Sequence, residues 1–289
     1  DILAFVHSII VNEVEFINGL FRFGDDSSSE NASDFERSLE LSEEPLNLQS
    51  SLGNIIARVI GSLKKPLKLR IEQVIRSENH LKVIQQIYGL LDLYRMMYQK
   101  QLPNDESGVF ELLDFSQSLC RERVFGVIKG TLKKVTQTYE KTEWELEDDS
   151  FLPPDWLSVF FNDTLIIFQS DSYGEGNIFG LNDTEFQTLS ELVVLEPVQI
   201  VKNQSEKAFG KSELISKLIF RLNCLDLIES KILPASKLSE QIKHIGNLIS
   251  QTKEEIVKSL YEELLLKSGL NIHQQLIQLI FPIEQIECE

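Results

Sequence analysis

Apolar residues recur at intervals of three and four along most of the chain, and no stretch alternates in the way that a half-buried strand does. Glycine and proline together account for 22 of 289 residues, about 8%, which is below the ordinary combined share of roughly 12%. This scarcity of residues that break secondary structure favours long uninterrupted helices or strands. The chain therefore predicts an all-α fold of nine or ten helices. The clearest helical spacing follows residues 2–21, 52–75, 81–98, 109–135, 155–170, 211–232 and 236–268.

Polar and breaking residues set the expected helix ends. Asn79 and Asn182 are suited to cap the starts of two helices, because a side-chain oxygen can accept from the free N–H groups of the first turn. Gly269 is suited to end a helix in the left-handed conformation. Pro66 is expected to kink or restart its helix, and Pro197 to kink or end its helix, since proline lacks the backbone donor.

Composition shifts predict two helical bundles, over residues 1–146 and 155–289. Residues 24–47 hold eight acidic residues against the single Arg37, so they are expected to form a disordered loop within the first bundle. The acidic run that begins at Glu143 ends in a proline pair. Residues 147–154 are therefore expected to be a hinge between the bundles.

Charge and composition exclude several classes of protein. The net charge of −17 argues against a nucleic-acid binder, because such proteins cluster Lys and Arg against phosphates. The longest apolar run is five residues, from Ile2 to Val6, whereas a membrane span needs about 20. Three scattered cysteines form neither a disulfide framework nor a zinc motif, which favours a cytosolic compartment. The chain starts at Asp1 without a preceding Met, so a fragment of a longer protein is expected.

No motif predicts catalysis, a cofactor or a metal. Gly174–Gly180 has the glycine spacing of a dinucleotide-binding turn after the apolar run Leu165–Phe168. Five polar or turn residues separate the two, and no strand–helix alternation surrounds them, so a loop between helices is the better interpretation. The four histidines are scattered, and His7 lies beside an apolar face, which is typical of a packed side chain. An enzyme is not expected.

A basic region lies between two acidic ones. Residues 1–50 hold 2 basic and 11 acidic residues, residues 51–142 hold 15 and 9, and residues 143–289 hold 11 and 25. With Leu67, Ile71 and Val74 facing inward, the 100° helical step turns Lys68 and Arg76 outward and leaves Arg70 at the edge of the apolar face, where an ion pair is expected. This region either balances the acidic residues of the same chain or binds a partner. The candidate protein-binding residues are Lys64, Lys65, Lys68 and Arg76.

Four segments resemble one known family. Residues 65–75, KPLKLRIEQVI, are similar to the RPLKVRIEQVI block of the sixth subunit of the conserved oligomeric Golgi tethering complex. Residues 1–7, DILAFVH, followed by Glu13, resemble the D-x-L-A-[WF]-x-H…E segment of the same family. Leu152–Asp155 lies where the family has a proline-rich segment, and Leu266–Leu270 resembles its segment after the last long helix. The acidic segment 24–47 departs from the family, whose linker there is shorter.

The resemblance implies an elongated helical-bundle rod of the multisubunit tethering complex type. It also implies a non-enzymatic role at the cytosolic face of Golgi membranes, as a peripheral membrane protein without a transmembrane segment. Its partners would be other subunits of the tethering complex and SNARE proteins during retrograde intra-Golgi transport, and the chain would be the C-terminal body of the subunit. A helical adaptor or the rod of another tethering complex stays open as an alternative, and an enzyme built on Gly174–Gly180 is a remote one.

Overall fold

A computed structural model of the 289-residue chain describes most of the residues after position 47 and a few near the start. The described residues are 4–5, 7–9, 11–12, 15–16, 48–101, 108–141, 151–169, 178–209 and 213–280. Within these ranges the regular structure is entirely helical and contains no strand, so the predicted all-α class is confirmed.

The chain divides into two compact units, Asp1–Val124 and Phe125–Glu289. The division falls inside α4, the long helix Val109–Lys141. The expected hinge at 147–154 overlaps residues 142–150, which lie outside the described residues, and it stays a prediction. The acidic segment 24–47 also lies outside them.

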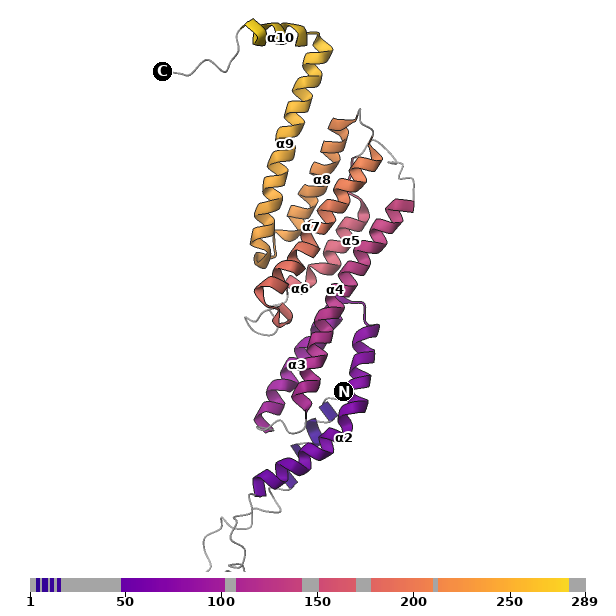
Figure 1. The fold of residues 1–289 in the computed structure, drawn as a ribbon, viewed down its shortest axis with the longest axis vertical. Helices are drawn as coiled ribbons and strands as arrows, with labels where there is room; N and C mark the ends of the chain where they lie inside the picture. The colour runs from indigo at the N-terminus through magenta and orange to yellow at the C-terminus, as the bar shows by residue number, and fades with distance from the viewer. Residues whose placement is uncertain are drawn as a thin grey trace, which may run out of the picture. The chain divides into compact units, whose positions relative to one another are not determined.

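The first unit contains α2 (Leu48–Ser77), α3 (Leu81–Gln101) and the first half of α4 (Figure 1). The Arg95 guanidinium on α3 pairs with Asp114 on α4. His7 packs its ring against Tyr94 and Tyr98, at 6.3 and 6.0 Å between centroids, as a packed histidine is expected to do. Side chains of all three helices form the core, among them Ile75, Ile84, Leu91, Tyr98, Leu112, Leu113 and Val124.

The turn between α2 and α3 is built differently from the prediction. The Glu78 carboxylate, and not the Asn79 side chain, accepts from the backbone N–H groups of Asn79 and His80 ahead of α3. These hydrogen bonds lower the pKa of Glu78. The Asn79 side-chain oxygen instead accepts from Arg123 on α4, at 2.7 Å. The prediction of an Asn79 cap was wrong because α3 begins only at Leu81, after His80, and a distant arginine uses the side-chain oxygen of Asn79.

The second unit contains the rest of α4 together with the elements that follow it. Within it α8 packs against α5, α7 and α9. The core includes Leu157, Phe161, Leu189, Val193, Phe220, Ile228 and Ile245. The elements are α5 (Asp155–Thr164), α6 (Ile166–Gln169), η2 (Ile178–Gly180), α7 (Asp183–Ala208), α8 (Leu214–Ile232), η3 (Ser236–Leu238), α9 (Ser239–Ser268) and α10 (Asn271–Ile280).

Two predicted helix ends are confirmed in this unit. The Asn182 side chain accepts from the backbone N–H of Glu185, whose carboxylate accepts in return from the N–H of Asn182. Gly269 ends α9 with φ of 71°, a conformation that costs glycine little.

Neither proline ends its helix. Pro66 lies inside α2 and Pro197 lies inside α7, and both helices continue past them. Pro197 is itself buried. Packing around the buried Pro197 can offset the one lost hydrogen bond, which local sequence does not reveal, whereas Pro66 is exposed.

Candidate interaction surfaces

The inward face of α2 sets where the predicted basic residues lie. Leu67 and Ile75 are buried at 8% and 0% exposure, whereas Val74 is 42% exposed. The buried face therefore follows a step of four residues through Ile71, and not the predicted face ending at Val74. Both sets of residues lie on one apolar side of the helix, and packing against α4 determines which set is buried.

The buried face of α2 is thus rotated around the helix axis from the predicted one. Two of the four candidate protein-binding residues, Lys64 and Lys68, therefore point toward α4. The Lys64 ammonium lies 2.5 Å from Glu111 Oε2, and the Lys68 ammonium lies 3.9 Å from the centre of the Phe115 ring. Gly108 leaves room for this arrangement, because a Cβ there would lie 2.7 Å from Lys64 Nζ. The outward orientation predicted for Lys68 is therefore wrong.

The hydrogen bond and charge of Lys64 lower the pKa of Glu111. Glu111 is itself largely exposed, so solvent screens this pair. Lys64 nevertheless pairs with Glu111 of its own unit.

The other two candidates face solvent. Lys65 is exposed, and Arg76 is exposed while its Nε donates to Glu72 one turn earlier, at 2.8 Å. Together with Arg58 and Leu69, also exposed, they occupy one outer row of α2 by the helical step. We call Arg58, Lys65, Leu69 and Arg76 the outer row of α2.

Arg70 does not form the expected ion pair. It is exposed, and its Nη1 donates to the neutral side-chain oxygen of Gln73 at 3.0 Å. Among the residues that the structure describes, it has no carboxylate partner within 4.0 Å. The rotated register of α2 explains the difference, because it moves Arg70 farther from the buried face.

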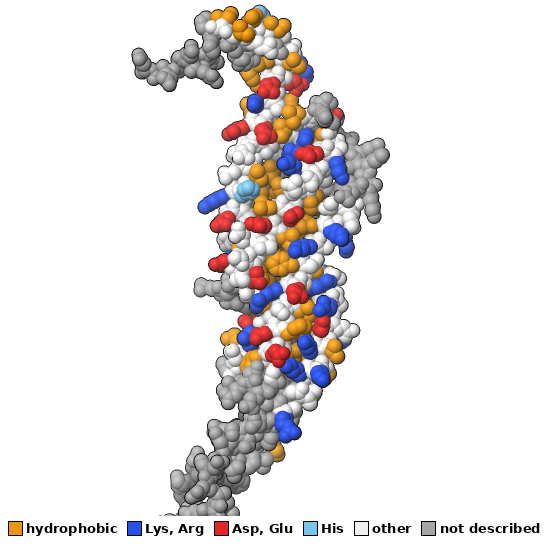
Figure 2. Space-filling view, viewed as in Figure 1, with side chains coloured by type: hydrophobic (Ala, Val, Ile, Leu, Met, Phe, Trp, Pro, Cys, Tyr) orange, Lys and Arg blue, Asp and Glu red, His pale blue; other side chains and the backbone are white. Residues whose placement is uncertain are grey.

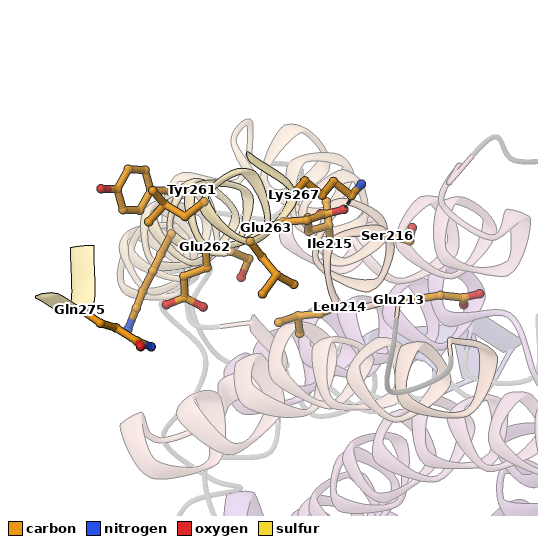
Figure 3. A pocket seen from close by; sticks show the side chains of 13 residues that line it. Glu213, Leu214, Ile215, Ser216, Tyr261, Glu262, Glu263, Lys267 and Gln275 are labelled. Atoms are coloured by element: carbon orange, nitrogen blue, oxygen red, sulfur yellow. Dashed lines mark ion pairs between the residues drawn. The ribbon is translucent and has the colours of Figure 1, made fainter. Parts of the chain in front are cut away.

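A pocket of about 990 Å³ lies in the second unit, at the start of α8 and the end of α9 (Figure 3). Leu214 and Ile215 of α8 line one side, and Tyr261 and Glu262 of α9 line another. Lys267 pairs with Glu263 across one turn of α9, at 2.5 Å. Gln275 of α10 contributes to the same pocket. Aliphatic and charged side chains line the pocket together, a composition that suits contact with a partner.

The end of the second unit exposes an apolar surface that sequence reasoning missed. Figure 1 shows α9 continuing beyond the start of α8, and α10 leaving from its tip. Val257 and Leu264 lie about 90° around α9 from the buried Ile245 and Ile249. The periodicity contains both stripes, and only the tertiary structure determines that the second is uncovered. The exposed apolar residues are Val257, Leu260, Tyr261, Leu264, Leu266, Leu270, Ile272, Leu276, Ile277, Leu279 and Ile280.

Three further features of the described residues bear on metal binding, dinucleotide binding and thiol chemistry. No group of three or more potential metal ligands occurs among them. Residues 166–169 are helical and Ile178–Gly180 is a 3₁₀ turn, so the strand that a dinucleotide-binding turn requires is missing from the described part of 165–180. Burial raises the pKa of the Cys120 and Cys224 thiols to about 12, which leaves both protonated at neutral pH.

The family model for the C-terminal region of subunit 6 of the conserved oligomeric Golgi complex matches residues 1–287. The chain belongs to this family. Proteins named conserved oligomeric Golgi complex subunit 6 from Meyerozyma guilliermondii, Saccharomyces cerevisiae S288c and Candida albicans are 30%, 29% and 31% identical to it. The matches cover 98%, 100% and 98% of this chain and 35%, 35% and 34% of those proteins.

The chain therefore spans about a third of the length of the subunit 6 proteins that it matches. No solved structure matches the chain. Among the described helices, none combines the length and the apolar character that a membrane span requires. The resemblance seen in residues 65–75 thus extends to a family relationship over nearly the whole chain.

Proposed function

We propose that the chain is the C-terminal body of a subunit of the conserved oligomeric Golgi complex and acts as a non-enzymatic binding scaffold in vesicle tethering. The match of the family model over residues 1–287 carries this proposal. The relatives are named as subunits of that complex. The proposed partners are the other subunits of the complex and SNARE proteins, and the proposed process is retrograde intra-Golgi transport. The proposed location is the cytosolic face of Golgi membranes, as a peripheral protein.

The helical architecture supports a binding role. Long helices present extended rows of side chains, and the exposed apolar end of the second unit has the composition of an interface core. Among the described residues, no group of three or more potential metal ligands occurs, and residues 166–169 are helical.

The experiment that tests this function is purification of the complete tagged subunit from its own cells. We expect the other subunits of the complex and Golgi SNARE proteins to co-purify in defined proportions. Association with a different set of helical adaptors, without those subunits, would contradict the proposal.

The basic region of α2 is proposed as one protein-binding surface, with roles that differ among its four candidates. Lys65 and Arg76 are exposed on the outer row and would contact an acidic partner directly. Lys64 and Lys68 contact Glu111 and Phe115, so they would shape the surface more than they bind. Leu69, exposed at 68% between the charges, offers the partner an apolar contact.

Charge reversal tests this surface. The double variant Lys65→Glu, Arg76→Glu should weaken binding to a purified acidic partner at low salt, while unfolding stays that of the wild type. Lys82→Glu, Lys133→Glu is the matched control, because both lysines are exposed on other helices. If the two variants bind the partner equally well, the basic region only balances the acidic residues of the same chain.

A further inference from the structure

Helix α10 is an amphipathic helix whose apolar side is not covered by its own unit. Leu279 is 83% exposed and Leu276 is 51% exposed. Orange side chains gather over α10 at the end of the second unit (Figure 2). A ten-residue helix is marginal in water without packing. Its stability in the working protein therefore calls for a surface that covers it.

The apolar residues of α10 follow the spacing of a ligand helix. Ile272, Leu276 and Leu279 lie at positions i, i+4 and i+7, and Ile280 extends the same side. Helices that dock into a hydrophobic groove use anchors at these positions. The exposed stripe of α9, through Val257 and Leu264, provides a second contact beside the same end.

Charge distinguishes a protein groove from an anionic membrane. After Lys267 the chain has no Lys or Arg, and it has three carboxylates at Glu284, Glu287 and Glu289. Helices that lie on anionic bilayers carry Lys and Arg on their polar side. The corresponding positions of α10 are held by Asn, His and Gln. The segment would be repelled by acidic lipid and attracted by a basic rim.

We propose that α10 is a ligand helix, which inserts Ile272, Leu276, Leu279 and Ile280 into a hydrophobic groove with a Lys/Arg-rich rim on another subunit of the tethering complex. This inference rests on the proposed function, because it places the groove on a complex partner. The uncharged helix supplies the apolar anchors, and the carboxylates that follow it in sequence complement the rim.

The test compares two double variants of the complete tagged subunit, each adding two aspartates to the second unit. Leu276→Asp, Leu279→Asp places charge on the proposed anchors. His273→Asp, Gln251→Asp places the same charge on exposed polar positions of α10 and α9, away from the anchors and from the pocket lining. We measure the amount of each other complex subunit that co-purifies, the circular dichroism spectrum, and binding to vesicles of phosphatidylcholine with and without phosphatidylserine.

We expect the anchor variant to lose at least one complex subunit by about tenfold or more, while the control stays within about twofold of the wild type. Both variants should keep the wild-type spectrum, because the altered side chains are exposed, and the wild type should not bind either vesicle. Equal co-purification by the two variants would overturn the inference and leave the proposed function standing. Vesicle binding, or self-association, that only the anchor variant loses would assign α10 to a membrane or to a second copy instead. A wild-type subunit without complex partners would overturn both proposals.

Discussion

The ammonium nitrogen of Lys68 lies 3.9 Å from the centre of the Phe115 ring, so a lysine of α2 stacks on an aromatic side chain of α4. The same two helices are joined by Lys64 and Glu111 one turn away. A residue that the sequence places at a basic docking surface is therefore used for packing inside the first unit.

Replacing Lys68 should destabilise the first unit. Lys68→Ala removes the cation–π contact and the packing of the aliphatic stem, and we expect a loss of about 1 kcal/mol in the free energy of unfolding. Urea denaturation measures it. Lys65→Ala is the control, since Lys65 is exposed on the outer row of α2, and it should stay within about 0.5 kcal/mol of the wild type. Equal effects of the two changes would contradict the stacking role.

A buried hydrogen bond joins α7 to α9. The Gln241 side-chain amide donates to the Ser190 hydroxyl at 2.9 Å, and both side chains are buried. Ser190→Ala leaves the amide without that acceptor, which should cost about 1–3 kcal/mol in the free energy of unfolding. The double variant Ser190→Ala, Gln241→Leu should recover part of the loss, because no polar group is then left unpaired. A double variant less stable than Ser190→Ala would show that the amide has another role.

The Lys64–Glu111 pair predicts a pH dependence of stability. The pKa of Glu111 is lowered by the hydrogen bond from Lys64 and by its charge, so the folded state holds this proton less tightly than the unfolded state. Its contribution is complete above the ordinary pKa of 4.5 and is lost as the pH falls through the lower folded value. Lys64→Met should therefore be less stable than the wild type at neutral pH, and the difference should shrink in acid. Thermal unfolding over a pH series checks this. For Lys65→Met, the difference from the wild type should not change with pH.

The two buried thiols should be unreactive in the folded protein. Burial raises the pKa of Cys120 and Cys224 to about 12, so little thiolate exists at neutral pH, and both side chains are inaccessible. Alkylation with iodoacetamide followed by peptide mass spectrometry should leave both unmodified. In denaturing urea both should react fully. Rapid native labelling of either would show that its unit opens locally.

Residues that act on their nearest neighbours were predictable. Asn182 is followed three residues later by Glu185, which is the pattern of a capping box, and Gly269 follows the last turn of a long helix. Asn79 has the same local suitability as Asn182, but Arg123, 44 positions away, uses its side chain. Pro197 does not end its helix for a related reason, since it is buried by packing from other helices, whereas Pro66 lies exposed inside α2.

The sequence by itself determined the helical class, the family and the basic region, because periodicity, residue order and charge are properties of neighbouring positions. Only the tertiary structure decided which stripe of each helix is buried. Leu67, Ile75 and Val74 all fit one amphipathic helix, and contact with α4 leaves Val74 outside. Likewise Ile249 and Leu264 are equally apolar, but only Ile249 is buried, because α9 continues beyond the start of α8. Burial depends on which helix ends lie side by side, and that relation between distant segments is absent from local spacing.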